Sequence, residues 1–175
     1  YAGNVLLCFD SALTVVDPNT GSETETRDPV GTGDAVVQGN SLFAVDGNGI
    51  VGYRPDEAQT EWRGPTIENI STSVTADNSL VAVGTENGTV HALNPTSGER
   101  YWEGAVTGEV SRLALSPHNV WVVNSQRGLF ALDRDSGDVV HQSTHDTGGS
   151  DIAVLDDILL LGGDDTNVYW IEAWC

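Results

Sequence analysis

The chain contains no lysine and no methionine, and its 7 basic residues, all arginine, stand against 26 acidic ones. A formal net charge of −19 at pH 7 excludes the basic face with which proteins bind nucleic acid. The acidic residues are scattered through the chain rather than gathered in a tail, which favours a solvated acidic surface. Such a surface repels itself in dilute buffer and is screened at molar salt, so the composition is typical of an extreme halophile, above all a haloarchaeon. An ordinary acidic protein that lacks lysine by chance is the alternative.

Long apolar runs are also missing from the sequence. Apolar runs such as the one from Ile158 to Leu161 have only the length of a strand. A helix that crosses a bilayer needs about 20 consecutive apolar residues. Direct insertion into a membrane is therefore not expected.

What the chain does contain is a segment that recurs about every 39 residues. The clearest copies run from Val90 to Trp102 and from Leu129 to His141. Fixed periods of this length indicate solenoids, propellers or arrays. Aligned on their turns, four copies place these residues at one position: Gly21, Ala58, Gly98 and Gly137.

Each copy consists of four short segments rich in Val, Leu and Ile and bounded by turn-forming residues, which predicts four β-strands. In the third copy the strands are expected at 73–76, 80–83, 89–93 and 100–103. In the fourth they are expected at 110–115, 120–123, 129–132 and 139–142. Helical apolar spacing is not found over any ten residues, so helix is expected to be nearly absent. One domain, 1–175, is predicted with units at roughly 1–30, 31–66, 67–105, 106–145 and 146–175.

The turn explains why the motif recurs. In the segment from Asn94 to Gly98, the Asn side chain can accept a hydrogen bond from the backbone two residues on, and Gly supplies the positive φ. Asp17 and Gly21 use the same chemistry, as do Asp133 and Gly137.

Two further positions of the repeat suit packing between sheets. Ala92 and Ala131 are small residues on the third strand, where a neighbouring sheet could approach closely. Trp62 and Trp102 follow the turn and are large enough to fill the space between sheets.

This pattern resembles the repeat of quinoprotein-type (PQQ-like) β-propellers, whose consensus is roughly Ala-x-Asp-x-x-Thr-Gly-x-x-x-Trp. The first copy departs from it at Val15 and Glu25, and the fourth has His141 in place of Trp. The resemblance implies an all-β propeller of about five four-stranded repeats, with a β-sandwich or a solenoid as alternatives. It also implies that each Trp docks against the turn of the next blade. The structural repeat residues are then Asp17, Gly21, Trp62, Ala92, Gly98, Trp102, Ala131, Asp133 and Gly137.

The register suggests that the propeller is incomplete at both termini. The chain opens on a second strand, 5–9, and ends on a third, 168–173. We expect either a compact five-bladed ring with trimmed end blades or a piece of a larger ring, which the missing initial Met favours. In a closed ring Cys8 and Cys175 could form a disulfide worth about 4 to 5 kcal/mol in the loop-entropy model. Two unpaired thiols are the alternative.

The residues that quinoprotein dehydrogenases of this family use are not found. Those enzymes have two adjacent cysteines, a calcium site and an Asp base, and no such set can be matched here. His141, His145 and Asp146 could ligate a metal, but solvated loop residues are favoured over ligands. The Asp133 and Asp17 segments are better explained as Asx turns than as calcium loops. The sequence therefore predicts no enzyme, no cofactor and no catalytic or metal site.

Two glycosylation sequons, at Asn69 and Asn87, lie on expected inter-strand loops. They give modest support to an extracellular or cell-surface location over a cytoplasmic one.

The sequence thus predicts a non-catalytic propeller scaffold of a halophilic archaeon, similar to the branch of the family that includes the bacterial outer-membrane assembly lipoprotein. Protein partners would bind a ring face, its loops or the central channel. Exposed aromatics such as Tyr53 or Tyr101 are candidate anchors, although packing between blades is the favoured role. The alternative is a piece of a larger enzyme or sensor whose site lies outside this chain.

Overall fold

The computed structural model describes residues 5–9, 12–27, 35–55, 57, 59–144, 151–155, 158–162 and 168–172. Within these ranges the chain forms strands β1 to β18 and no helix. The first sheet holds β1 (Val5–Phe9), β2 (Ala12–Val16) and β3 (Glu23–Arg27). The second holds β4 (Ala35–Gln38), β5 (Ser41–Val45), β6 (Ile50–Arg54) and β7 (Gln59–Arg63). The third holds β8 (Thr75–Ala76), β9 (Val81–Gly84), β10 (Thr89–Leu93) and β11 (Arg100–Ala105).

The remaining strands form two more sheets. The fourth holds β12 (Val110–Leu115), β13 (Asn119–Asn124), β14 (Gly128–Asp133) and β15 (Val139–Thr144). The fifth holds β16 (Asp151–Leu155), β17 (Ile158–Gly162) and β18 (Val168–Glu172). In every sheet the strands pair antiparallel in chain order, so three four-stranded sheets are flanked by two three-stranded ones. This confirms the predicted all-β architecture of four-stranded repeats that is incomplete at both ends of the chain.

One strand is shorter than the sequence predicts. The first strand of the third sheet pairs only at Thr75 and Ala76, not over 73–76. The preceding residues are held in another way, because Gly84 N donates to Thr72 Oγ1 at 2.8 Å and Ser71 N donates to Gly84 O at 2.9 Å. Because these hydrogen bonds use the backbone of Gly84 at the end of β9, β8 pairs with β9 over only two residues.

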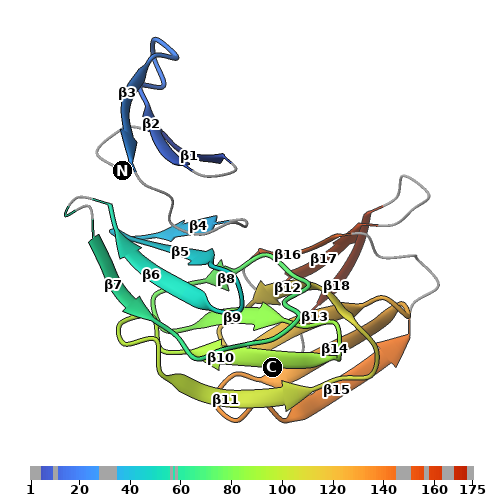
Figure 1. The fold of residues 1–175 in the computed structure, drawn as a ribbon. Coiled ribbons are helices and arrows are strands. Elements are labelled where there is room, and N and C mark those ends of the chain that lie inside the picture. Colours follow the sequence, from blue (N-terminus) through green and yellow to red (C-terminus); the bar gives the residue numbers. More distant parts are fainter. Residues whose placement is uncertain are drawn as a thin grey trace.

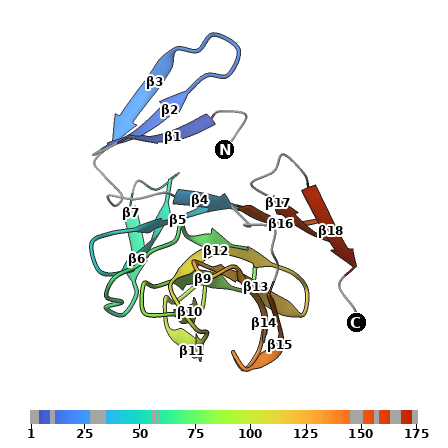
Figure 2. The same ribbon diagram turned by 90° about the vertical axis from the view of Figure 1, so that its right-hand side faces the viewer.

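The sheets from β4 to β18 follow one another as an arc, with their first strands innermost (Figure 1). The innermost strands contact their neighbours, β4 with β8, β8 with β12, and β12 with β16. The β1–β3 sheet lies beyond β4–β7, outside this arc, in both views (Figure 2). The described part of the chain contains no helix of the length and apolarity that crossing a membrane requires.

Each middle strand divides its side chains between two cores, because successive residues of a strand point to opposite faces. On β9, Val81 and Val83 belong to one core cluster, together with Phe43 of the second sheet. Ala82 belongs to another, together with Val122 of the fourth sheet. Burial of each aliphatic or aromatic side chain stabilises the fold by about 1.5–3 kcal/mol. The second to fifth sheets therefore stack face to face as the blades of a propeller do.

Four sheets carry a β-bulge at the same place, next to the end of the third strand. The register shifts between Val15 and Val16, Gly52 and Tyr53, Ala92 and Leu93, and Ala131 and Leu132. The extra residues on the fourth strands are Thr24, Glu61, Tyr101 and Val140. In the third and fourth sheets the bulge turns this residue outwards, and Tyr101 and Val140 are accordingly 53% and 59% exposed.

Candidate interaction site

Three turns between third and fourth strands are built alike. The Oδ1 atoms of Asp17, Asn94 and Asp133 accept hydrogen bonds from the amide two residues on, at 2.8, 2.7 and 3.0 Å. Gly21, Gly98 and Gly137 close these turns with φ of 69°, 72° and 77°. The amides at Asn19 and Ser136, which favour the charged carboxylate, lower the pKa of Asp17 and Asp133 respectively. The three turns thus share one hydrogen-bonded conformation, and those at Asn94 and Asp133 mark one rim of the arc of sheets.

Two tryptophans lock their sheets to the next turn along the chain. Trp62 Nε1 donates to Pro95 O at 2.9 Å, and Trp102 Nε1 donates to Arg134 O at 2.8 Å. A Cβ atom at Gly98 would collide with the Trp62 ring, and one at Gly137 with the Trp102 ring. Glycine is therefore required at these positions both by the positive φ and by the close approach of the indole.

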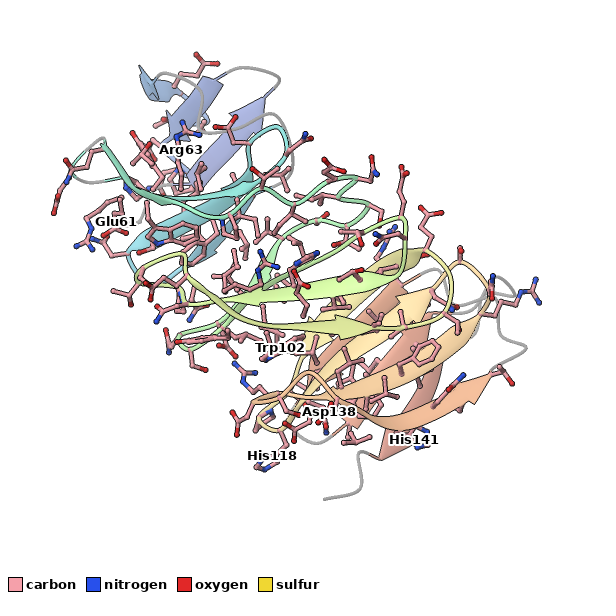
Figure 3. All side chains as sticks on the ribbon, turned by 60° about the horizontal axis from the view of Figure 1, so that its bottom comes forward. Glu61, Arg63, Trp102, His118, Asp138 and His141 are labelled. Atoms are coloured by element: carbon pink, nitrogen blue, oxygen red, sulfur yellow. The ribbon has the colours of Figure 1, made fainter. Side chains whose placement is uncertain are left out.

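The small repeat residues lie beneath these contacts. Ala92 is fully buried opposite Trp102, and Ala131 is buried opposite His141. His141 occupies the repeat position of the tryptophans, but its side chain is exposed on β15 (Figure 3). The fourth strand of the fourth sheet consequently has no buried residue, in contrast to β7 and β11.

A buried arginine joins the turns of the third and fourth sheets. Arg134, whose side chain is 11% exposed, places its Nη2 atom 2.6 and 2.5 Å from the two carboxylate oxygens of Asp77. The same nitrogen donates to Ser79 Oγ at 2.9 Å, and Nη1 donates to Ser116 O at 2.7 Å. The Arg134 amide also donates to His118 O at 3.0 Å, which brings the turns that carry His118 and Asp138 together (Figure 3).

Arg134 and its partners Asp77, Ser79 and Ser116 form the Arg134 clamp. The electrostatics of this clamp favour the charged form of Asp77. Burial of the Asp77 carboxyl raises its pKa. The hydrogen bond from Arg134, the amides of Ser79 and Leu80 and the positive charge of Arg134 together lower the pKa by more than burial raises it. The net pKa of Asp77 lies below its ordinary value of 3.8. The clamp is therefore a carboxylate–guanidinium pair at neutral pH.

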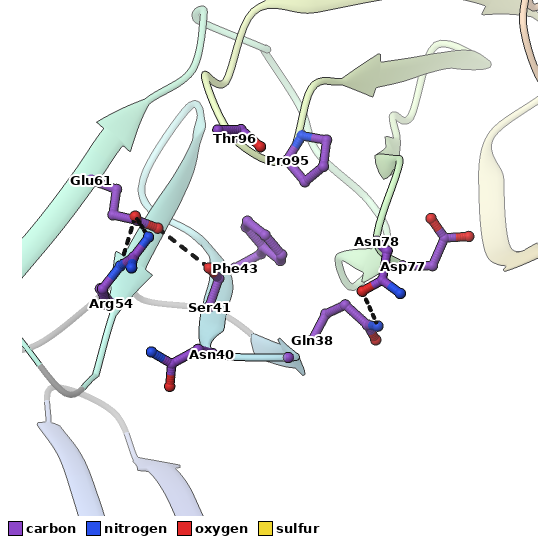
Figure 4. Close-up of a pocket in the computed structure, with 11 residues that line it drawn as sticks. Gln38, Asn40, Ser41, Phe43, Arg54, Glu61, Asp77, Asn78, Pro95 and Thr96 are labelled. Atoms are coloured by element: carbon purple, nitrogen blue, oxygen red, sulfur yellow. Dashed lines mark hydrogen bonds and ion pairs between the residues drawn. The ribbon is translucent and has the colours of Figure 1, made fainter.

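A pocket of about 210 Å³ opens at the same rim, between the second and third sheets (Figure 4). Phe43, only 2% exposed, forms part of its wall and stacks on Trp62 with ring centroids 5.7 Å apart. Glu61 projects from β7, accepts from Ser41 Oγ at 3.3 Å and pairs with Arg54. Across the pocket, Gln38 Nε2 donates to Asn78 Oδ1 at 2.9 Å. Most of this lining is polar, with one aromatic wall.

The opposite rim carries the two sequons. Asn69 and Asn87 are exposed, and their loops lie together because Glu86 N donates to Asn69 O at 2.9 Å. Asn87 Oδ1 accepts from Thr85 Oγ1 at 2.5 Å and from Thr89 N at 3.2 Å. Glycosylation at both positions stays a prediction.

The remaining candidate residues from the sequence are buried, exposed or outside the described residues. Tyr53 is 6% exposed and packs with Leu42 and Val51, so of its two expected roles the favoured one, packing, applies and an exposed anchor does not. Tyr101 is exposed, because it is the bulge residue of β11. The side chain of Cys8 lies outside the described residues, as do these residues entirely: Ala58, His145, Asp146 and Cys175. Among the described residues, no group of three or more His, Cys, Asp or Glu side chains could hold a metal ion.

His91 is buried on β10 and behaves as a core residue. It is 8% exposed, and burial followed by the charge of Arg100 lowers its pKa from 6.5 to about 4. The imidazole is therefore neutral at pH 7. Glu103 Oε1 lies 3.4 Å from Nδ1, but this nitrogen has no hydrogen-bond partner among the described residues, so the contact is not a salt bridge.

Neither the Arg134 clamp nor the pocket was predicted from the sequence. They could have been inferred from the residue that follows the Asx residue of each turn, because its type differs between copies of the repeat. Pro95 and Arg134 both follow the Asx residue of their turns, yet only one can reach a neighbouring sheet with a charged side chain.

Comparisons with known proteins agree with this geometry. A family model described as "Outer membrane protein assembly factor BamB" matches residues 9–173. The outer membrane protein assembly factor BamB of Yersinia pestis is 32% identical over 150 residues, which are 75% of this chain and 38% of that protein. The chain thus spans well under half the length of this relative.

Solved structures share the fold at low sequence identity. The crystal structure of BamB from Moraxella catarrhalis has a TM-score of 0.70 at 23% identity, covering 81% of this chain and 44% of that one. The computationally designed Ika8 protein has a TM-score of 0.79 at 17% identity, covering 97% of this chain and 55% of that one. For the designed Ika4 protein the TM-score is 0.71 at 16% identity, covering 79% and 88%. These likenesses concern the fold alone, and together with the sheet topology they confirm the predicted propeller.

Proposed function

The chain belongs to the family of the outer membrane protein assembly factor BamB, and from this premise we propose that it is a non-catalytic propeller scaffold that binds other proteins. The observation that carries the proposal is the family match, which runs through nearly the whole chain. The relatives are named for assembling proteins, not for a reaction. Hydrogen-bonded turns at one rim of the propeller, one of which contributes Pro95 and Thr96 to the lining of a pocket, are the kind of platform on which binding residues occur.

A thermal-shift titration tests whether the chain itself is a quinoprotein. Pyrroloquinoline quinone together with Ca²⁺ is expected to leave Tm unchanged, because a non-catalytic scaffold is expected to bind neither. A ligand present at 100 times its Kd stabilises a protein by about 2.7 kcal/mol, and each kcal/mol raises Tm by roughly 2–4 °C at this chain length. A rise of that size on addition of both ligands, absent with Ca²⁺ alone, would contradict the non-catalytic reading.

The second candidate is part of a larger enzyme or sensor. It is favoured by one observation, the short span of the chain relative to its Yersinia pestis relative. The same titration on the protein as its own cells produce it separates the two candidates, since only an enzyme would bind the quinone there.

We further propose an extracellular or cell-surface setting in a halophilic archaeon. The acidic, lysine-free composition supports the second part, and the exposed Asn69 and Asn87 support the first. A disulfide between Cys8 and Cys175 is proposed for the same setting, and comparison of masses with and without reductant after thiol alkylation would reveal it.

Salt dependence tests the halophilic part of this proposal. With a net charge of −19, the folded chain is expected to need roughly molar salt, at which the Debye length is about 3 Å. Thermal unfolding followed from dilute buffer to molar KCl should show Tm rising throughout. An undiminished cooperative transition in dilute buffer would refute the halophilic origin.

A further inference from the structure

The pocket between the second and third sheets has a filled counterpart one sheet further along. A shift of about 39 residues carries Gln38 onto Asp77 and Asp77 onto Ser116. The same shift carries Pro95 onto Arg134. Gln38, Asp77 and Pro95 line the pocket, whereas Asp77, Ser116 and Arg134 form the clamp.

The backbone supports this correspondence independently of the sequence alignment. Asp77 N donates to Leu80 O and Ser116 N donates to Asn119 O, each at 2.9 Å. The carbonyls of the two turn residues, Pro95 and Arg134, each accept a tryptophan Nε1 hydrogen at 2.9 and 2.8 Å. The pocket and the clamp are therefore equivalent places in the repeat.

A guanidinium fills the counterpart, and proline leaves the pocket open. Arg134 spans from its turn to the Asp77 carboxylate, the Ser79 hydroxyl and the Ser116 carbonyl. Pro95 cannot do the same, because its ring carries no donor and its nitrogen has no hydrogen. The volume that remains at its place is about 210 Å³.

The groups around this volume suit a guanidinium from elsewhere. The amide of Gln38 lies at the repeat position that Asp77 has in the counterpart, and the backbone carbonyl of Asp77 corresponds by the same shift to that of Ser116. Glu61, whose Oε1 atom pairs with Arg54, adds a carboxylate on one wall, and its Oε2 atom accepts only from Ser41 Oγ, at 3.3 Å, among the contacts described. Phe43 adds an aromatic surface of the kind on which guanidinium groups stack. Planar donors, acceptors at several angles and an aromatic wall match arginine better than lysine.

We propose that the pocket receives the side chain of an arginine from a partner protein, which takes the place that Arg134 takes one sheet further along. This inference rests on the proposed interaction role and adds the chemistry of the partner. The net charge of −19 draws a cationic segment towards the chain, and the pocket then fixes its register.

The first test is an NMR titration of the intact chain with N-acetyl-arginine-N-methylamide. The side-chain amides of Gln38 and Asn78 and the backbone amide of Thr96 should shift saturably, with a Kd on the order of millimolar because one side chain buries little surface. The matched lysine analogue should bind at least about threefold more weakly. No saturable shift at these residues, or equal binding of the lysine analogue, would overturn the proposal.

Filling the pocket from within is the second test. Pro95→Arg should recreate the clamp, abolish binding of the arginine analogue and raise Tm by roughly 2–4 °C. Ser97→Arg adds the same charge to an exposed position of the same turn and should leave binding intact. Retained binding in Pro95→Arg would overturn the proposal.

A third variant keeps the test decisive if Pro95→Arg does not fold. Glu61→Gln retains the size of the side chain but removes the pocket carboxylate, so affinity for the arginine analogue should fall at least about threefold. Unchanged affinity would count against the proposal. If the analogue does not bind but a protein partner still cross-links to this rim, the arginine pocket is rejected and the scaffold role is retained.

Discussion

Replacing Trp102 by Ala is expected to lower the free energy of unfolding by about 3–5 kcal/mol, the range for truncation of a large buried aromatic residue. The indole fills the space between the third and fourth sheets, where it covers Gly137 and donates to Arg134 O. Its removal leaves a cavity and an unpaired carbonyl at once. Urea unfolding at fixed salt measures the loss.

Two matched variants separate packing from hydrogen bonding at this position. Trp102→Phe keeps most of the ring and loses the N–H, so it should cost about 1–3 kcal/mol. Tyr101→Ala changes the neighbouring residue, which is 53% exposed, and should stay within about 1 kcal/mol of the parent protein. Equal losses for Tyr101→Ala and Trp102→Ala would show that docking of the tryptophan is not what joins the sheets.

Replacing Arg134 by Met should cost about 2–3 kcal/mol. Removal of one partner of a buried ion pair costs about 3–5 kcal/mol, and we reduce this figure because the Asp77 side chain is 38% exposed. The variant leaves the Asp77 carboxylate without its cation and the Ser116 carbonyl without its donor. Arg112→Met is the control, since Arg112 is 55% exposed and contacts Asp151 only at 3.8 Å; it should cost less than about 1 kcal/mol.

The same pair makes a pH prediction with a definite sign. Asp77 has a folded pKa below its ordinary 3.8, so its contribution to stability is present above pH 3.8 and is lost as pH falls through the folded pKa. Below pH 3.8 the parent protein should therefore lose more stability than Arg134→Met. Parallel stability curves for the two proteins in this range would show that the pair does not titrate as a unit.

The features of this molecule that repeat could be predicted from the sequence. The turn at Asn94 to Gly98 appears again at Asp133 to Gly137, and each copy supports the interpretation of the other. The same holds for Trp62 and Trp102, whose position after the turn suggested packing between sheets. Their indoles lie against the next turn in the structure.

Features that occur in one copy could not be found in this way. The Arg134 clamp depends on a side chain that crosses to another sheet, and nothing in the local sequence indicates how far the sheets stand apart. The short β8 depends on the bonds of Thr72 and Ser71 to the end of β9, which form only in three dimensions. The sequence left both an anchor role and the favoured packing role open for Tyr53, because the alternation of a strand alone does not reveal which faces are covered; the structure buries it.

Partners are expected to bind at the rim that carries the pocket, and site-specific photo-cross-linking in the cells that make this protein tests this most directly. A photoreactive residue at Thr96, on the pocket, is compared with one at Gln126, exposed in the β13–β14 turn of the opposite rim. We predict a protein adduct from position 96 that is lost in Pro95→Arg, and none from position 126. No adduct from position 96, or adducts of equal yield from both positions, would contradict the account.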